Sequence, residues 1–290
     1  MAASRGHALF YCLENGAVLL LSAIKKATAT ELEGIMQQIT DSVNVTTSPG
    51  LTGAAGCIHG FFERGGGVSL GPHRSLNVGL HVGDDREAVW ANRVRIKNGL
   101  GLGRLISARQ VHGIETCCIT GQPRGDEEIP GYDALITDRP GVGLMVQHAD
   151  CQPVLLFDPV RRVAGAVHSG WRGSVRNILG HVVNDFVDKF SSNPQDIKAA
   201  IGPSLGPCCA EFIHYRTELP EIFQQFAAAE NHFDFWRISS HQLLEAGLLS
   251  GNIDCVNICT CCNQRYFSYR RAVRENGGIT GRLCSVIALV

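Results

Sequence analysis

Residues 142–171 read VGLMVQHADCQPVLLFDPVRRVAGAVHSGW, and our interpretation of the chain starts from this stretch. It holds three apolar runs of strand length, separated by polar and turn residues: Val142–Val146, Val154–Phe157 and Val163–Val167. Apolar runs of this length with turn residues between them predict three successive strands. Cys151 and His168 stand at the ends of such runs, where a packed core has no need of soft ligands or nucleophiles. The stretch therefore predicts a functional site at strand ends.

The composition is that of an ordinary globular protein. The chain has 290 residues, of which 44% are hydrophobic and 18% charged, and its net charge is −1. This balance gives no support for nucleic-acid binding, which requires a basic surface, and no apolar run approaches the ~20 residues that span a bilayer. The longest N-terminal run, Ala17–Ile24, has no basic region before it and no cleavage-like site after it. We therefore expect a cytoplasmic protein without nucleic-acid or membrane partners.

Twelve cysteines are a high count for such a chain. A protein of this size does not need disulfides for stability, and an export signal is missing from the sequence, so we interpret most of them as buried thiols in a reducing cytoplasm. The run Cys259-Thr260-Cys261-Cys262 resembles a metal-binding knuckle. No second cysteine pair lies at zinc-finger distance from it, and structural thiols are therefore the favoured interpretation.

The first 50 residues differ from the rest and are interpreted as an N-terminal extension of unknown role, followed by one catalytic domain over residues 51–290. A capping-box pattern predicts a helix over Glu31–Ser42, and Asn44–Gly56 is typical of a linker. Further helices are expected at Arg86–Asn98, Ser174–Phe190, Leu219–Ala229 and Ser240–Ser250. Further strands are expected at Cys57–Phe62, Leu105–Val111, Tyr132–Thr137, Ile197–Ile201, Ile253–Ile258 and Cys284–Val290. Because strands outnumber helices and some are successive, we expect a mixed sheet with helices outside it.

His112, Cys151 and His168 form the sharpest constellation of reactive side chains, since each ends or follows an apolar run. Two histidines and a cysteine without an obvious fourth ligand fit a catalytic zinc site, where one position stays open for water or substrate. The Cys–His pair equally fits a thiolate nucleophile with a histidine base. A third interpretation is copper with Met145 as a weak axial ligand, although the chain has no His-x-His pair for a multicopper cluster. Spacing alone leaves these alternatives, and simple packing roles, open.

Several polar residues are candidates for oxyanion binding or proton transfer. Arginine suits the bidentate recognition of phosphate, and the sequence offers Arg74, Arg93 and Arg109, with Asn77 nearby. For each of them a solvated surface position is the simpler interpretation. His148 is a further candidate for a fourth ligand or a proton shuttle, but a core or supporting role is favoured.

From about Ile58 to the C-terminus, roughly four-fifths of the chain, an ordered series of motifs resembles one family. It is the laccase-domain family, also named multicopper polyphenol oxidoreductase or purine nucleoside phosphorylase. The motifs are His59-Gly60-Phe61-Phe62, Gly65-Gly66-Gly67-Val68-Ser69, Ser75-Leu76-Asn77-Val78-Gly79, Val82-Gly83-Asp84-Asp85, Asn92-Arg93, Gln110-Val111-His112-Gly113, Asp133-Ala134-Leu135-Ile136-Thr137, Ala149-Asp150-Cys151, His168-Ser169-Gly170-Trp171-Arg172-Gly173, Ile201-Gly202-Pro203, Cys208-Cys209, Phe267-Ser268-Tyr269-Arg270-Arg271 and Thr280-Gly281-Arg282.

The resemblance implies an α/β fold with two mixed sheet layers between helices, an α/β/β/α sandwich similar to the cytotoxic-necrotizing-factor-like fold. It also implies that His112, Cys151 and His168 are the metal ligands, with zinc as the ion and copper as the alternative. Asn77, Arg93 and Cys151 are then catalytic residues, and Asn77, Arg93 and Gln110 bind substrate or phosphate. Two positions depart from the family pattern: Ser169 replaces an alanine, and Ala210 replaces the tyrosine usual after Cys208-Cys209.

The activity implied by the resemblance is phosphate-dependent cleavage of purine nucleosides (inosine, adenosine, guanosine and methylthioadenosine) to base and pentose 1-phosphate, accompanied by adenosine deamination. Oxidation of polyphenols with copper is the alternative, and a Cys151/His168 thiol hydrolase is the third hypothesis. Because zinc has no redox chemistry, the oxidase hypothesis requires copper in the same three ligands. We expect a monomer or weak homodimer whose partners are purine nucleosides and phosphate.

Overall fold

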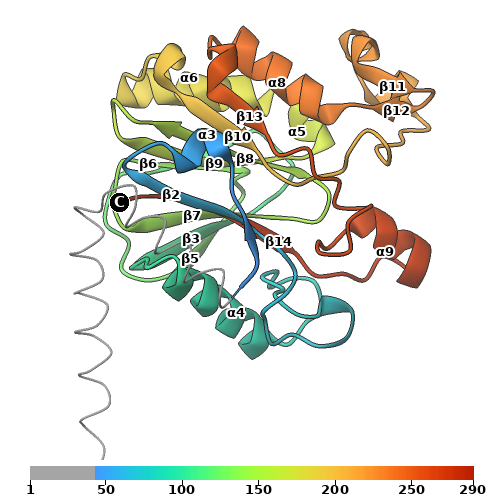
Figure 1. Cartoon of the computed structure of the whole chain (residues 1–290), viewed down its shortest axis with the longest axis horizontal. Helices are drawn as coiled ribbons and strands as arrows, with labels where there is room; N and C mark the ends of the chain where they lie inside the picture. The colour runs from blue at the N-terminus through green and yellow to red at the C-terminus, as the bar shows by residue number, and fades with distance from the viewer. Residues whose placement is uncertain (1–42) are drawn as a thin grey trace, which may run out of the picture.

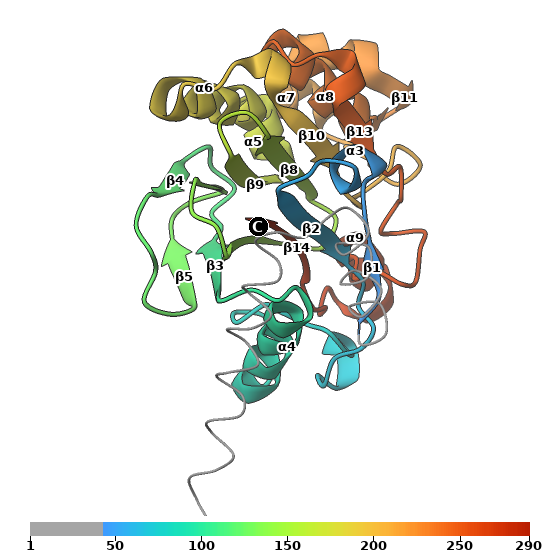
Figure 2. The ribbon, with the colours of Figure 1, turned by 60° about the vertical axis from the view of Figure 1, so that its left-hand side comes forward.

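The computed structural model describes residues 43–290, so the helix expected over Glu31–Ser42 lies outside the described part. Two six-stranded mixed sheets pack face to face. Helix α4 (Arg86–Gly99) covers the outer face of one sheet, and helices α6 (Ile178–Phe190) and α8 (Phe235–Glu245) cover that of the other (Figures 1 and 2). This arrangement confirms the α/β/β/α sandwich.

The first sheet has its C-terminal strand near the middle, between strands from the beginning and the centre of the chain. Parallel and antiparallel neighbours both occur in it, as the mixed sheet predicted. Its strands, in spatial order, are Val45–Thr46 (β1), Cys57–Phe62 (β2), Leu283–Leu289 (β14), Val142–His148 (β7), Arg104–Arg109 (β3) and Glu127–Pro130 (β5).

The second sheet contains the other two strands of the stretch at 142–171, which pair antiparallel with each other. Its strands, in spatial order, are Ile253–Cys255 (β13), Lys198–Ile201 (β10), Gln152–Asp158 (β8), Val163–Ser169 (β9), Ala134–Thr137 (β6) and Thr116–Ile119 (β4). The three predicted strands are thus confirmed, but the chain passes from one sheet to the other between β7 and β8. Every residue of β8 and β9 is buried, because helices and the first sheet cover both faces.

Alternation of side chains along each strand divides the core into three layers. Between the sheets, Phe61, Leu144 and Ile287 meet Leu155 and Ala166. A second layer joins the outer face of β8 and β9 to α6, and a third joins the outer face of the first sheet to α4. At about 25 cal/mol per Å² of buried apolar surface, these layers supply most of the driving force for folding, and they fix the strand ends that carry the reactive residues.

Two of the expected helices differ from the structure. The helix predicted over Ser174–Phe190 is two helices, α5 (Trp171–Val175) and α6, because Asn177 takes a left-handed conformation (φ 56°) and its side chain caps α6 by accepting a hydrogen bond from Gly180. The helix predicted over Leu219–Ala229 is wrong: Pro220 precedes a 3-10 helix, η3 (Glu221–Phe226), and Ala227–Ala229 (β11) pairs with His232–Phe233 (β12).

Two predicted helices are present, and the remaining helices of the described residues are short. The predictions at Arg86–Asn98 and Ser240–Ser250 correspond to α4 and to α8, which begins five residues earlier than expected. The Asp85 side chain caps α4 by accepting a hydrogen bond from the backbone of Ala88. The other helices are Pro49–Thr52 (α3), Gly71–His73 (η1), Pro194–Asp196 (η2), Tyr215–Glu218 (α7), Ser250–Asn252 (η4) and Tyr269–Asn276 (α9).

The segment expected to be a linker, Asn44–Gly56, is part of the fold, because it contains β1 and α3. The backbone N–H of Ser48 donates to His59 Nε2 (2.9 Å), and its hydroxyl donates to Asp254 (2.5 Å). These contacts hold the segment in place, although its Thr, Ser, Gly and Pro content predicted a linker. No helix among residues 43–290 has the length and apolar character to cross a membrane.

Candidate metal centre and substrate cavity

The strand ends of both sheets converge at one edge of the sandwich. In the first sheet β3 and β7 run parallel and both end at this edge. In the second sheet Gln152 at the start of β8 pairs with Ser169 at the end of β9. The turn from β7 into β8 therefore brings Cys151 beside His168, and the loop after β3 brings His112 to the same place. The structure thus unites the three residues that the sequence singled out.

The ligand atoms of His112, Cys151 and His168 all lie within 4.8 Å of one another. Cys151 Sγ is 3.9 Å from His112 Nε2, and the two imidazole rings stand at 86° with their centroids 4.9 Å apart. His168 is buried, Cys151 is partly buried and His112 is exposed. A tetrahedral zinc with these ligands would hold them roughly 3.5 Å apart, so the three donors need only a small adjustment to share one ion.

Asp133 orients two of the three candidate ligands. Its carboxylate accepts a hydrogen bond from His168 Nδ1 (2.8 Å) and others from the backbone N–H groups of His112 (3.0 Å) and Gly113 (2.7 Å). Because Nδ1 is engaged, His168 presents Nε2 to the cluster, as metal-bound histidines with a supporting carboxylate do. In the sequence Asp133 stands in one of the family motifs, but no role was predicted for it. Its position directly before an apolar strand run was the available signal.

Cys151 is held by a strained turn. Asp150 has a φ of 90°, and its side chain accepts hydrogen bonds from Thr260 Oγ1 (2.7 Å) and from the backbone N–H of Arg270 (2.6 Å). Its carbonyl accepts from the N–H of Leu205 (2.8 Å). A non-glycine residue keeps such a conformation only where its surroundings determine it. Three separate segments therefore fix the direction of the thiol.

The electrostatics of the cluster favour a thiolate. Burial would raise the pKa of Cys151, but the charge of His168 and a hydrogen bond from His112 lower it from 9.0 to about 6. Burial would likewise lower the pKa of His168, whereas the Cys151 thiolate and the hydrogen bond to Asp133 raise it to about 9. The thiolate is the form of cysteine that binds metals and attacks electrophiles.

Gly170 supplies the space that the cluster needs. A Cβ atom at this position would lie 2.9 Å from His112 Cδ2 and 3.3 Å from Cys151 Sγ. Any larger residue would therefore displace the ligands. The donor set, the supporting carboxylate and this space fit a zinc ion with one open position.

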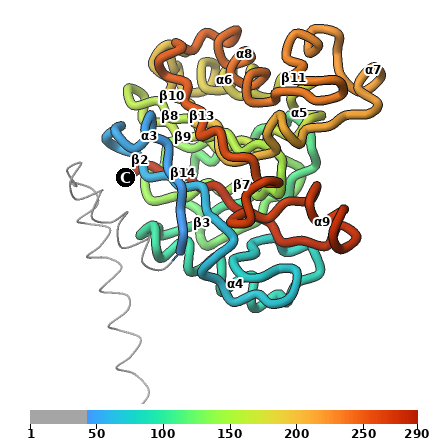
Figure 3. The backbone as a smooth tube through the Cα atoms, turned by 45° about the vertical axis from the view of Figure 1, so that its right-hand side comes forward, coloured from blue at the N-terminus to red at the C-terminus, as the bar shows by residue number. Residues whose placement is uncertain are grey.

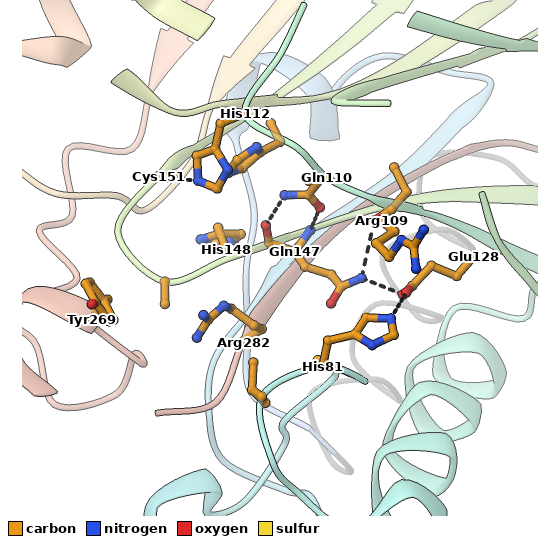
Figure 4. Close-up of a pocket in the computed structure, with 15 residues that line it drawn as sticks. His81, Arg109, Gln110, His112, Glu128, Gln147, His148, Cys151, Tyr269 and Arg282 are labelled. Atoms are coloured by element: carbon orange, nitrogen blue, oxygen red, sulfur yellow. Dashed lines mark hydrogen bonds and ion pairs between the residues drawn. The ribbon is translucent and has the colours of Figure 1, made fainter. Parts of the chain in front are cut away.

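A cavity of about 480 Å³ opens on one side of the cluster and has a cationic wall (Figure 4). Arg282 points into it: its Nη1 donates to the carbonyls of Thr280 and Gly281 (both 3.2 Å), and for its Nε and Nη2 we find no partner among residues 43–290. Arg109 and His81 also line this wall. We call this space the polar cavity.

A second cavity of about 330 Å³ has an aromatic wall. Trp171, Phe212, Phe235 and Tyr269 line it, together with Ala210, which is buried. The two cavities share His112, Ala149, Cys151 and Tyr269 in their linings. We call this second space the aromatic cavity, and two of the candidate metal ligands, His112 and Cys151, lie where it meets the polar cavity.

Asn77 and Arg93 are absent from the linings of both cavities. Asn77 is fully buried and accepts hydrogen bonds from the backbone N–H groups of Gly79 (2.9 Å) and Arg282 (2.7 Å). Arg93 donates to the carbonyl of Val78 (2.9 Å) and pairs with Glu128 (2.6 Å), a residue of the polar cavity. Both side chains use their polar groups on the protein itself, and they support residues that line the cavity.

Gln110 lines the polar cavity, but its amide also serves the fold. It donates to the carbonyl of Gln147 (2.6 Å) and accepts from the N–H of the same residue (2.7 Å), as Figure 4 shows. These two hydrogen bonds attach the segment between β3 and His112 to the C-terminal end of β7. Gln110 therefore fixes the loop that carries the first candidate ligand.

Two other residues considered from the sequence occupy different places. His148 lines the polar cavity as a neutral ring: burial, aided by the charges of His168 and Arg282, lowers its pKa to about 3, and its Nε2 bonds to Ser285 Oγ (2.9 Å). Met145 is wrong as an axial copper ligand, because it is buried in the core layer between the first sheet and α4.

The cysteine prediction also needs correction. Of the eleven cysteines among the described residues, all have free thiols but only Cys57, Cys261 and Cys284 are buried. Four others, Cys208, Cys209, Cys259 and Cys262, gather in one place, with sulfur atoms within 4.8 Å of one another.

Comparison with known proteins gives the family of the chain. Residues 58–290 match the family model described as multi-copper polyphenol oxidoreductase laccase. The chain belongs to this family. Among its relatives, the Geobacillus stearothermophilus protein named purine nucleoside phosphorylase YlmD is 36% identical over 252 residues, which cover 80% of this chain and 90% of that protein. The Escherichia coli protein named purine nucleoside phosphorylase YfiH is 34% identical, covering 78% and 90%.

Solved structures of family members share the fold. The crystal structure of YlmD from Geobacillus stearothermophilus superimposes with a TM-score of 0.75 at 35% identity, covering 83% of this chain and 94% of that one. A Neisseria meningitidis protein superimposes with a TM-score of 0.69 at 27% identity, covering 86% and 99%. The family description names a copper oxidase, whereas the relatives' names give a phosphorylase, so the site must decide between them.

Proposed function

We propose that this protein is a zinc-dependent purine nucleoside phosphorylase that also deaminates adenosine. The observation that carries the proposal is the position of the three candidate ligands: His112 and Cys151 line both the polar and the aromatic cavity, and His168 lines the polar one. A nucleoside and phosphate need these two environments side by side. The relatives named purine nucleoside phosphorylase support the same activity.

The aromatic cavity suits the purine base. Trp171 and Phe212 meet edge to face at 6.1 Å, and Phe212 lies tilted against Phe235 at 5.2 Å, so the wall is already packed before any ligand enters. A flat heteroaromatic ring gains dispersion and quadrupole interactions on such a surface, about 0.5–1.5 kcal/mol for each aromatic pair. The substrates considered are inosine, adenosine, guanosine and methylthioadenosine, which share this ring.

The polar cavity suits phosphate. Arg282 and Arg109 offer guanidinium groups there, and guanidinium recognises phosphate through paired hydrogen bonds. Asn77 holds the backbone of Arg282, and Arg93 holds Glu128, which in turn receives hydrogen bonds from Gln147 (2.9 Å) and His81 (3.0 Å). In this proposal Arg282 contacts the anion, whereas Asn77, Arg93 and Gln110 position the residues that do.

The chain's own contribution is to hold and orient the reactants. A zinc ion in this ligand set would supply Lewis-acid stabilisation of an oxyanion or lower the pKa of a water molecule toward ~7. Asp133 keeps Nε2 of His168 directed at the cluster, and His148 stays a buried neutral ring whose Nε2 bonds to Ser285 Oγ. Phosphorolysis occurs at the sugar carbon and deamination at purine C6, at opposite ends of adenosine. The two activities therefore require two binding orientations.

The test is chromatography of the products from inosine and adenosine, with and without phosphate, beside metal analysis of the same preparation. We expect base and pentose 1-phosphate from inosine only when phosphate is present, and inosine from adenosine without it. The His112→Ala variant should lose this activity and one zinc per chain, whereas Cys117→Ala, a partly buried cysteine of β4 outside both clusters, should lose neither. Phenol oxidation with bound copper and no base release would overturn the proposal.

A thiol hydrolase is the second candidate, because Cys151, His168 and Asp133 stand in the order of a nucleophile, a base and a group that orients the base. The same assay separates the two functions. Base release that survives removal of the metal by a chelator, but disappears in Cys151→Ala, would assign the reaction to the thiolate. We place the enzyme in the cytoplasm, as a monomer or weak homodimer whose partners are purine nucleosides and phosphate.

A further inference from the structure

A second group of metal-binding side chains lies outside the catalytic cluster. The sulfur atoms of Cys208, Cys209, Cys259 and Cys262 all lie within 4.8 Å of one another. Cys262 Sγ is 3.5 Å from the sulfurs of both Cys208 and Cys209. The first two cysteines follow β10 and the last two follow β13, so about 50 residues of chain separate the pairs. This separation is far longer than zinc-finger spacing, so the sequence does not show that the two pairs meet.

Strand pairing explains how distant cysteines meet. Strands β10 and β13 run parallel, with Ala199 opposite Ile253 and Ile201 opposite Cys255. The segments that follow these two strands continue side by side beyond the sheet, where Ser204 and Cys259 form a parallel bridge. Figure 3 shows the segment after β13 leaving the upper layer toward α9. The loops after both strands therefore end in the same place.

The local backbone is that of a metal-binding knuckle. Cys259 and Cys262 are spaced as C-x-x-C, and the N–H of Asn263 donates to the carbonyl of Cys259 (3.1 Å). The N–H of Gly206 donates to Cys259 Sγ (3.3 Å), a contact that stabilises negative charge on sulfur. A Cβ at Gly206 would lie 3.0 Å from Cys259 Cβ and 2.8 Å from Trp236, so only glycine allows this approach.

We propose that Cys208, Cys209, Cys259 and Cys262 bind a thiophilic divalent metal ion, with zinc as the ion that fits best. Four thiolates at Zn–S distances of about 2.3 Å lie roughly 3.8 Å apart in a tetrahedron, close to the spacing of these sulfurs. Four thiolates so close together repel one another, and a divalent cation offsets this repulsion. A complete set of four sulfur ligands is typical of structural rather than catalytic zinc.

The site would brace the turn that carries Cys151. Thr260, between the two knuckle cysteines, donates to Asp150 Oδ1 (2.7 Å). Arg270 donates its backbone N–H to Asp150 Oδ2 (2.6 Å) and its Nη1 to the carbonyl of Cys209 (3.1 Å). The metal would join the two loops that make these contacts. The proposal does not depend on the reaction that the enzyme catalyses.

A disulfide is the competing use of these residues. Two of the four cysteines, Cys208 and Cys262, are exposed, and their sulfurs are 3.5 Å apart, well beyond the 2.05 Å of a disulfide bond. A disulfide would engage two sulfurs and leave Cys209 and Cys259 as thiols. A metal ion would engage all four, which gives the two interpretations different stoichiometries.

The experiment uses the full chain, expressed and purified without added metal or chelator. Metal content per chain is measured for the wild type, Cys262→Ser, Cys259→Ser and the control Cys255→Ser, a partly buried cysteine of β13 outside the cluster. We expect the two cluster variants to contain one metal ion fewer than the wild type and the control to match it. Because His112→Ala removes the other ion, the double variant His112→Ala/Cys262→Ser should contain none.

Cobalt substitution gives a readout that does not depend on how well a variant folds. Wild-type protein loaded with Co²⁺ should show the intense sulfur-to-cobalt charge-transfer absorption of a four-thiolate site, and this absorption should persist in His112→Ala. Its absence from both proteins would overturn the proposal. So would an intact mass lower by two hydrogens after purification, which would show a disulfide, or a metal content that Cys259→Ser and Cys262→Ser leave unchanged.

Discussion

Two candidate metal clusters lie on either side of the Asp150 turn, yet they are built differently. One is the proposed catalytic cluster of His112, Cys151 and His168, and the other is the cysteine cluster of Cys208, Cys209, Cys259 and Cys262. The first has three donors of mixed type and borders two cavities. The second has four donors of one type, and none of its sulfurs lines either of these cavities. An incomplete ligand set beside a cavity leaves a position for substrate, whereas a complete set serves structure. The number of ligands, and not the presence of cysteine, would then separate the two proposed roles.

The largest expected effect comes from removing one ligand in each cluster. Cys151→Ala should lower kcat/KM for inosine phosphorolysis roughly a thousandfold, because a metal contributes several kcal/mol of transition-state stabilisation. Cys262→Ser should lower the melting temperature and retain measurable turnover at low temperature, because its cluster touches no substrate. Steady-state kinetics and thermal unfolding of both variants check this contrast.

Cys117→Ala serves as the control for both variants, since this cysteine of β4 belongs to neither cluster. It should keep wild-type kinetics and stability. Equal losses of activity in Cys151→Ala and Cys262→Ser, at a temperature where both are folded, would erase the distinction between the clusters.

The next largest effect tests the orientation of the ligands. Burial would raise the pKa of Asp133, but the hydrogen bond and charge of His168 keep it below its usual value, so the carboxylate stays charged. Asp133→Asn places an amide N–H₂ against backbone N–H donors and weakens the hold on His168. We expect metal affinity at the catalytic cluster to fall about 10–100-fold, measured by competition with a chromophoric chelator.

Asp138→Asn is the matched control, because Asp138 follows the other end of β6 and pairs with Arg139. Its metal affinity should equal that of the wild type. If Asp133→Asn also bound metal normally, the carboxylate would serve to hold the loop after β3 against the start of β6 and not to orient the ligands.

How far the sequence could predict the molecule depended on whether the signal was local. Strands β7, β8 and β9 could be predicted from the sequence because each contains an uninterrupted apolar run. The break before α6 was not, because it depends on one left-handed residue, Asn177, inside a continuous apolar stripe. The spacing of apolar residues indicates whether a segment is a helix or a strand, but it does not indicate the backbone angle of a single residue.

In the candidate site, too, the residues with a local sequence signal were predicted and those that depend on the tertiary structure were not. His112, Cys151 and His168 are reactive residue types at the ends of apolar runs, so pattern and motif together found them. Asn77 and Arg93 were expected to touch phosphate, but residue type alone does not reveal that Arg282 and Glu128 already occupy their hydrogen-bonding groups. The four-cysteine cluster depends on the parallel pairing of β10 with β13, which is a property of topology and not of spacing.

Arg282 allows the polar cavity to be tested apart from the metal. Burial lowers the pKa of Arg282 from its usual value, and an arginine side chain stays protonated in proteins. Arg282→Ala removes the charged donors that face the cavity, and the KM for phosphate should rise about tenfold, the equivalent of one charge-assisted hydrogen bond. Arg274→Ala, at an exposed arginine of α9, should leave this KM unchanged. A rise in the KM for inosine alone would place the base, and not phosphate, beside Arg282.

The smallest expected effect concerns the aromatic cavity. Ala210 is buried in its wall, at the position where the family resemblance implies tyrosine. Ala210→Tyr adds a ring to a cavity of about 330 Å³, and one further aromatic contact with the purine should lower the KM for inosine about threefold, with kcat unchanged. Ala229→Tyr, at an exposed residue of β11, should alter neither constant. If Ala210→Tyr raised the KM for inosine while the KM for phosphate stayed the same, the ring would be filling the space of the base. If neither constant moved, the base would bind outside the aromatic cavity, and only the polar cavity would remain as the substrate site beside the catalytic cluster.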